Sequence, residues 1–163
     1  MAEPGKIIAV LVANPALSSI LTMVLASVPS FRVRPFASEL ALQVYMRLAP
    51  VHLVVADFDA EHARADRVIR DLRDDPAIEH ADFQVIALAS AVTPETKALC
   101  RGAGIDEVIV KPMSPRYLLE RVQPRLRQRA IHQTLRRPAP RPDFAAAGNV
   151  IPLWTAERPQ PQH

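Results

Sequence analysis

The sequence predicts an α/β fold, a doubly wound five-stranded parallel sheet with a C-terminal extension. Short apolar, Val-rich runs alternate with longer amphipathic stretches over about 130 residues, as in parallel sheets covered by helices on both faces. The central run, 51–56, stops abruptly at Asp57. A chain of 163 residues, 49% of them hydrophobic and 23% charged, is long enough for one domain with its own core and a further segment.

Strands and helices are predicted to alternate five times along the chain. The predicted strands span residues 6–12, 31–35, 51–57, 83–88 and 107–110. The predicted helices span residues 15–28, 38–48, 61–73 and 93 to 102 or 104, and a last helix starts at 114. This regular alternation favours right-handed strand–helix–strand units in a single sheet.

Local residue types support the helix positions. Pro15 suits the first turn of the first helix, and Ser38 suits the N-cap of the second. Thr93 before Pro94 marks the start of the fourth helix, and the glycines at 102 and 104 mark its end. In the third helix, one face is apolar and the opposite face is charged. The apolar face consists of Val68, Ile69 and Leu72.

Composition and charge restrict the class of protein. The net charge of +3 and pI near 9.5 permit an acidic partner without requiring nucleic acid. The single cysteine, Cys100, excludes an internal disulfide and a thiolate metal cluster, so we expect a reducing, cytoplasmic location. The uncharged stretch 7–31 raises the alternative of a signal peptide or membrane helix. Asn14-Pro15 interrupts this stretch, so a strand followed by a helix is favoured and no membrane is expected.

Asp57 is the first candidate for a functional residue. It lies where a buried strand leaves the sheet, and ligands collect at the carboxyl ends of strands in open α/β sheets. An aspartate at such a junction also commonly caps the following helix. From the residue alone, the two interpretations are equally good.

A longer pattern distinguishes them. Asp57 ends the third strand, 102–104 reads Gly-Ala-Gly, and 108–115 reads Val-Ile-Val-Lys-Pro-Met-Ser-Pro. Together with the order of elements, these motifs resemble the CheY-like receiver domain of bacterial response regulators, over residues 5–130. The resemblance implies a flavodoxin-like receiver fold, with Asp57 at the phosphoacceptor position and Lys111 at the position that contacts the phosphoryl group. It also implies a cis peptide before Pro112.

The sequence departs from the family at several functional positions. Two adjacent acidic residues that hold Mg²⁺ in the family are matched by Val12 and Ala13. Mg²⁺ requires oxygen ligands, so we expect its binding to be weak or lost and phosphoryl transfer to Asp57 to be impaired. The usual hydroxyl residue is matched by Ala89, with Ser90 next, and the usual aromatic residue by Val108. The chain thus resembles a degenerate receiver without the acidic pair.

Other polar residues lie close to Asp57 in the sequence. Asp59 and His62 are close in sequence and superficially resemble a metal cluster, but solvated loop residues are the favoured interpretation because the chain should turn here. Asn14 offers an amide oxygen for at best a weak cation site. Without the acidic pair, Lys111 is expected to form a direct ion pair with Asp57 that fixes the pocket in one state.

The first helix is apolar over an unusually wide arc. The apolar residues are Leu17, Ile20, Leu21, Met23, Val24, Leu25 and Val28. We predict an exposed apolar margin around Met23 and Leu25 that contacts a partner; scattered exposed apolar residues without a function are the alternative. The resemblance implies that this helix belongs to the face that docks on a histidine kinase.

The C-terminal part, 131–163, is predicted to comprise a helix extension, a Pro-rich linker and an arm. Ile131 and Leu135 point away from the apolar stripe of the last helix, which suggests contact with a second protomer. Beyond the stiff linker 138–142, an apolar cluster is expected to dock on its own domain or on a dimer partner. The cluster includes Phe144, Ile151, Leu153 and Trp154.

Arginines crowd the last helix, with Glu120 as the only acid identified to oppose them. They are Arg116, Arg121, Arg125, Arg127, Arg129, Arg136 and Arg137. No aromatic or base-reading residues are interleaved with them, so a solvated face or an acidic partner is favoured over nucleic acid.

The favoured function is that of an atypical single-domain response regulator in two-component signal transduction, neither an enzyme nor dependent on a cofactor. It would act through contacts with a histidine kinase or another two-component protein and form a homodimer. A working phosphoacceptor that uses Asp57 with weak metal binding is the main alternative. An unrelated α/β enzyme has little support, because a Gly-rich phosphate loop, a catalytic triad and metal-ligand spacing are missing from the sequence.

Overall fold

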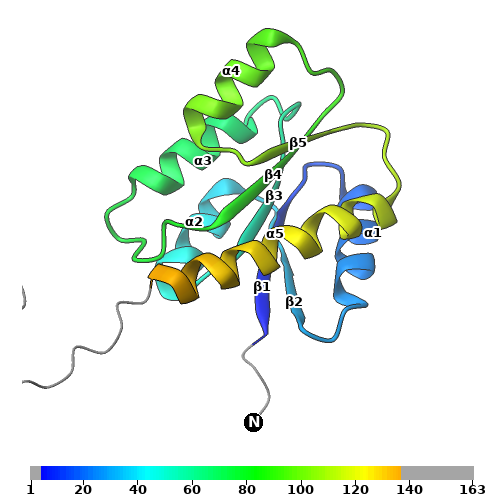
Figure 1. Cartoon of the computed structure of the whole chain (residues 1–163). Coiled ribbons are helices and arrows are strands. Elements are labelled where there is room, and N and C mark those ends of the chain that lie inside the picture. The colour runs from blue at the N-terminus through cyan, green and yellow to red at the C-terminus, as the bar shows by residue number, and fades with distance from the viewer. Residues whose placement is uncertain (1–4, 137–163) are drawn as a thin grey trace, which may run out of the picture.

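The computed structural model describes residues 5–136 and contains the predicted five-stranded parallel sheet with helices on both faces (Figure 1). The strands are β1 (Lys6–Leu11), β2 (Phe31–Pro35), β3 (Leu53–Asp57), β4 (Gln84–Ala89) and β5 (Glu107–Val110). The helices are α1 (Pro15–Ala26), α2 (Glu39–Leu48), α3 (Ala65–Asp74), α4 (Pro94–Ala103) and α5 (Pro115–Arg136). The strand order β2-β1-β3-β4-β5 confirms the doubly wound fold class.

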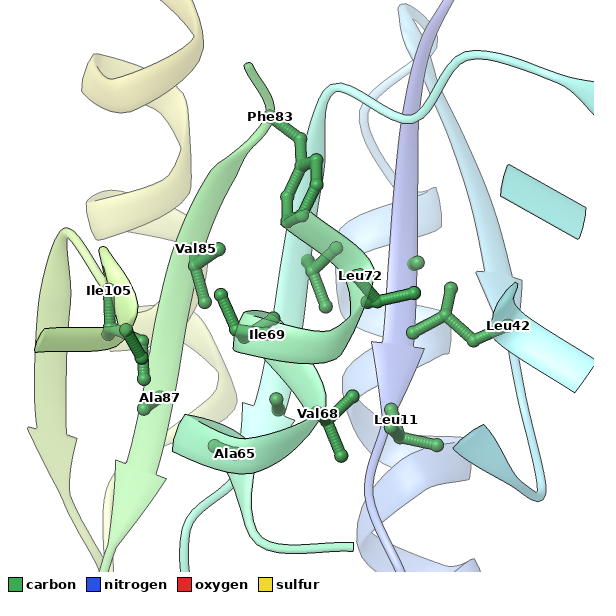
Figure 2. Packing of buried hydrophobic residues seen from close by; sticks show 14 of the residues in the cluster. Leu11, Leu42, Ala65, Val68, Ile69, Leu72, Phe83, Val85, Ala87 and Ile105 are labelled. Carbon is green, nitrogen blue, oxygen red and sulfur yellow. The ribbon is translucent and has the colours of Figure 1, made fainter. Parts of the chain in front are cut away.

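The sheet separates two hydrophobic clusters because successive strand side chains point to opposite faces. Ala9 in β1 and Val54 in β3 face the first cluster, which contains residues of α2, α3 and α4. Figure 2 shows Val68, Ile69 and Leu72 of α3 directed at the strands. These three residues form the apolar face predicted for this helix. The neighbouring strand residues face the second cluster, which contains residues of α1 and α5. Burial on both faces explains why the strands read as continuous apolar runs.

Short polar side chains start the helices where the sequence predicts. The hydroxyl of Ser38 accepts a hydrogen bond from the Ala41 amide at 3.2 Å, and that of Thr93 accepts one from the Thr96 amide at 3.1 Å. Asn14 caps α1 in the same way. At the end of α4, Gly104 adopts φ 76°, a left-handed conformation that costs glycine little. These caps fix the lengths of the loops at both edges of the sheet.

One predicted boundary was wrong. Helix α3 begins at Ala65 instead of residue 61, because Arg64 still has an extended backbone. The chain after β3 forms a loop that is held to the end of the neighbouring strand, and this loop uses the residues expected in the first helical turn. Asp57 therefore lies well before the helix, and the N-cap of α3 is Arg64, which makes no side-chain cap bond. The capping interpretation of Asp57 was wrong.

Strand β2 forms one edge of the sheet. Arg32, Arg34 and Pro35 in this strand are all exposed. At the end of the described chain, α5 continues without interruption through residue 130, and the boundary between 130 and 131 remains a prediction. None of the helices in residues 5–136 is both long and apolar enough to cross a membrane.

Candidate functional site

Polar side chains from four separate parts of the chain meet at the carboxyl edge of the sheet. Asp57 ends β3, Ser90 follows β4, Lys111 follows β5 and Asn14 precedes α1. They line an open hollow of about 430 Å³ together with Leu17, Pro112 and Met113. Parallel strands bring their carboxyl ends to one edge, so residues far apart in sequence are collected here.

Asp57 is paired with Lys111. The Asp57 side chain is largely buried, and its Oδ1 accepts hydrogen bonds from Lys111 Nζ and from the amide of Asp59, both at 2.9 Å. This confirms the expected ion pair. The Lys111–Pro112 peptide is cis, as the resemblance implied.

Asp59 has a larger role than the sequence suggested. Its side chain is 35% exposed, as expected in a loop, but the carboxylate is bound rather than merely solvated. Oδ2 accepts hydrogen bonds from the amide of Ser90 at 2.7 Å and from the Ser90 hydroxyl at 2.6 Å, and Lys111 Nζ lies 2.9 Å from the same oxygen. Asp59 is thus an exposed loop residue, as predicted, and its carboxylate also ties this loop to the end of β4. His62 is exposed.

The two acids and the lysine shift one another's ionisation. Partial burial of Asp59 opposes its charge, but hydrogen bonds from Ser90 and Lys111 outweigh burial and lower its pKa. Partial burial likewise opposes the charge of Lys111, yet its bonds to Asp59 and Asp57 raise its pKa. The site therefore stabilises the ammonium together with the Asp59 carboxylate.

These pKa shifts predict how stability depends on pH. Because the pKa of Asp59 is lowered on folding, its contribution is present above its unfolded pKa of about 3.9 and is lost as the pH falls through the folded value. The raised pKa of Lys111 contributes below about 10.4 and is lost as the pH rises through the folded value. We expect Asp59→Asn to flatten the acid limb of the free energy of unfolding, measured by urea denaturation from pH 2 to 7. An unchanged acid limb would contradict this prediction.

The positions matched to the family's metal ligands are apolar in the structure. Val12 is buried in the second cluster, whereas Ala13 is exposed. The side-chain oxygen of Asn14 accepts a hydrogen bond from the Leu17 amide at 3.1 Å, so this oxygen is engaged in capping α1. Within residues 5–136, no group of three or more His, Cys, Asp and Glu side chains is arranged to hold a metal ion. Ala89 is buried in β4, and Val108 packs at the margin of the first cluster.

The predicted apolar margin of α1 was right for one residue and wrong for the other. Met23 is 70% exposed, and Ile20 beside it is 46% exposed. Leu25 is completely buried, because it lies one turn after Leu21 on the stripe that packs in the second cluster with α5. Leu25 therefore belongs to the core, and its prediction as an interface residue was wrong.

A second exposed apolar stripe lies on α2. Leu40, Val44 and Leu48 are spaced four residues apart and are exposed, so they share one side of the helix. The sequence analysis did not identify them, although their i, i+4, i+8 spacing was visible. The opposite side of α2 supplies Leu42 and Met46 to the first cluster.

The arginines of α5 have an acidic partner that the sequence analysis missed. Glu107 of β5 forms ion pairs with Arg121 and with Arg125, the second at 3.0 Å. The claim that Glu120 alone opposes the arginines was therefore wrong, since Glu107 lies in a preceding strand. The remaining interface candidates lie outside the described side chains. They are Ile131, Leu135, Phe144, Ile151, Leu153 and Trp154.

No protein-family model and no curated protein matches the sequence. A receiver domain protein (CheY-like) of Methanospirillum hungatei JF-1 has a TM-score of 0.69 at 17% identity, covering 78% of this chain and 98% of that one. For the chemotaxis protein CheY4 of Vibrio cholerae the TM-score is 0.66 at 15% identity, over 74% and 98% of the two chains.

A response regulator of Thermotoga maritima gives a TM-score of 0.64 at 23% identity, over 75% of this chain and 98% of that one. At these identities the likeness concerns the fold alone. The five-stranded parallel sheet and its five helices agree with the fold of these neighbours. The described part of this chain has the fold of a response regulator receiver domain.

Proposed function

We propose that this protein is a two-component signalling protein of the receiver type that acts by contact, with phosphoryl transfer to Asp57 impaired. One observation carries the proposal: Lys111 pairs with both Asp57 and Asp59. The positions matched to the family's metal ligands hold Val12 and Ala13. The protein would bind a partner without catalysing a reaction.

Magnesium chemistry fits this donor set poorly. Phosphoryl transfer requires a cation that neutralises charge on the transferring group, and Mg²⁺ is selected by carboxylate and water oxygens. Here Oδ1 of Asp57 and Oδ2 of Asp59 are already paired with the Lys111 ammonium, and the side chains of Val12 and Ala13 offer no oxygen. A divalent ion would have to compete with Lys111 for these two oxygens.

Contact surfaces remain available when the pocket is fixed. The exposed side chains of Ile20 and Met23 on α1, and the stripe on α2, are apolar surfaces on the described domain. We propose a histidine kinase or another two-component protein as the partner and the cytoplasm as the location. Nucleic acid is not favoured, because Arg121 and Arg125 are engaged by Glu107. Self-association through residues 131–163 remains a prediction.

Incubation with Mg²⁺ and acetyl phosphate tests the impaired transfer. We expect intact-mass spectrometry to find no added phosphoryl group on the wild-type chain. A mass gain that disappears in Asp57→Asn would favour the alternative, a working phosphoacceptor. This alternative is supported by the position of Asp57 in an open hollow beside Lys111.

Substitution at Met23 tests the contact surface. We expect Met23→Glu to weaken binding to a histidine kinase from the same organism by about tenfold or more, because a charge would be buried against an apolar partner. Ala98→Glu is the matched control, an equivalent change at an exposed position of α4. Isothermal titration calorimetry measures both affinities. Equal losses in the two variants, or none in either, would contradict this surface.

A further inference from the structure

The outward face of α2 is apolar, where a solvent-exposed helix normally carries charge. Leu40, Val44 and Leu48 are 67%, 47% and 84% exposed, and their spacing of four residues places them in one line along the helix. We call these three residues the α2 stripe. A single exposed leucine is ordinary on a protein surface, but three residues in line form a continuous apolar patch, and such patches mark contact surfaces.

The polar side chains of α2 are held away from the stripe. Gln43 Nε2 and Arg47 Nε each donate a hydrogen bond at 2.8 Å to Oδ2 of Asp75, which follows α3. These bonds turn both side chains towards the end of α3. Glu39, the other charged residue of α2, is partly buried. The charged side chains of α2 therefore leave the stripe uncovered.

The stripe leads to the amino edge of the sheet. Helix α2 connects the parallel strands β2 and β3, so it runs back from the carboxyl edge to the amino edge. At its end, a hollow of about 70 Å³ continues the stripe and is lined by Leu48, Pro50 and His80, among others. An apolar segment that arrives at this edge can follow the stripe from the hollow onwards.

Helix α5 delivers the rest of the chain to the same edge. Arg125 Nη2 donates to the carbonyl of Asp106, just before β5, at 3.1 Å, so α5 has reached the amino edge by residue 125. It continues to Arg136. From residue 136 to residue 150 the chain can span up to about 45 Å, whereas a domain of this size has a radius of gyration of about 14 Å. The segment that begins at 150 can therefore reach the α2 stripe of its own domain.

This segment matches the stripe in charge and length. Residues 144–156, beyond the described chain, contain no charged residue. The apolar residues in 150–154 are Val150, Ile151, Leu153 and Trp154. In an extended conformation 150–154 spans about 15 Å, and the α2 stripe is about 12 Å long. Contact between them would remove apolar area from water without burying an ion.

We propose that residues 150–154 dock on the α2 stripe of their own domain. Tethering gives the segment an effective concentration on the order of millimolar, so at micromolar protein concentration it meets its own domain before a second copy. The α1 surface is a poorer match, because Ile20 and Met23 are three residues apart and form a shorter patch. The docked segment covers α2 and leaves α1 free for a partner.

This inference goes beyond the proposed function, because it concerns a contact within one chain. If 150–154 did not dock, the acetyl phosphate result and the effect of Met23→Glu on kinase binding would be unaffected. Conversely, a kinase that bound equally well after Met23→Glu would contradict the contact surface on α1 without deciding where 150–154 dock. The two ideas are therefore tested separately.

The test uses the fluorescence of the full-length chain, in which Trp154 is the only tryptophan. We expect a blue-shifted emission and weak quenching by acrylamide, both unchanged on dilution from about 100 to about 1 μM. Val44→Glu and Leu48→Glu should each lower the ratio of docked to free segment about tenfold or more, because a charge would be buried against apolar residues. Their emission should shift to the red and their quenching should increase.

Controls separate docking on α2 from a general effect of charge. Ala98→Glu makes an equivalent change at an exposed position of α4 and should leave the emission of Trp154 unchanged. Met23→Glu examines the α1 surface in the same way and should also leave the emission unchanged. Trp154→Ala provides an independent measurement: the ¹⁵N–¹H signals of the α2 stripe should shift, whereas the signal of Ala98 should not. Urea denaturation establishes that each variant is folded.

Four results would overturn the proposal. One is a wild-type chain in which Trp154 is quenched as strongly as free tryptophan. Another is emission from folded Val44→Glu and Leu48→Glu that equals that of the wild type. Quenching that weakens as the protein concentration rises would place the segment on a second copy. A red shift in Met23→Glu but not in Val44→Glu would place it on α1.

Discussion

Lys111→Met should lower the free energy of unfolding by about 2 kcal/mol. Loss of one partner from a buried ion pair typically costs about 3–5 kcal/mol, and we reduce this figure because the Lys111 side chain is 21% exposed. The methionine is similar in length but leaves the carboxylates of Asp57 and Asp59 beside each other without their cation. Urea denaturation at pH 7 measures the loss, with an unchanged m-value indicating that both states keep their compactness.

A second variant distinguishes lost pairing from lost packing. Lys111→Met combined with Asp57→Asn should recover most of the lost stability, because the buried carboxylate that needed compensation has become neutral. Lys97→Met is the control for the lysine-to-methionine change at an exposed position of α4 and should leave stability within about 0.5 kcal/mol. If Lys111→Met were as stable as this control, the ion pair would not hold the site in one state.

Ala13→Asp should create measurable Mg²⁺ binding at the carboxyl edge. Ala13 is exposed in the loop after β1, so a carboxylate can be introduced there with little desolvation. One added carboxylate near a divalent ion should tighten Mg²⁺ binding about tenfold or more, on the order of 1.4 kcal/mol. Calorimetric titration with MgCl₂ measures the affinity, and the acetyl phosphate assay then tests whether phosphoryl transfer to Asp57 is partly restored.

The choice of Ala13 over its neighbour follows from burial. Val12 is 5% exposed and packs in the second cluster, so an aspartate there would bury a charge in the core. Ala13→Asn is the matched control, because it adds similar bulk without the charge. Ala13→Asp combined with Asp57→Asn should bind Mg²⁺ no better than the wild type. If the wild-type chain already bound Mg²⁺ as tightly as Ala13→Asp, this would contradict the proposal that the metal site is lost.

The fold was predictable because its determinants are local. The short, Val-rich run that ends at Asp57 favours a strand covered on both faces, and β3 is buried throughout. Caps such as Ser38 and Thr93 start helices through hydrogen bonds within three residues. The pair of Asp57 and Lys111 was also predictable, through the resemblance, since Asp57 ends β3, Lys111 follows β5, and both strands end at one edge of the sheet.

Other features depend on contacts that sequence spacing does not encode. Asp59 is bound to Ser90, 31 residues away, because the loop after β3 folds onto the end of β4. The exposure of Met23 and the burial of Leu25 depend on how α1 is rotated against α5, and a wide apolar arc does not specify that rotation. Glu107 opposes arginines of a different element. In each case the three-dimensional neighbour, and not the residue type, determines the role.

The arginines and proline of the outer strand β2 have a consequence for the protein at high concentration. An unpaired strand edge is a template on which further chains can add and grow into fibrils, and charged side chains and proline oppose that growth. Arg32 and Arg34 repel their counterparts on a second molecule, and Pro35 has no amide hydrogen to donate. In a crowded cell, this edge of the sheet should therefore resist amyloid-like growth.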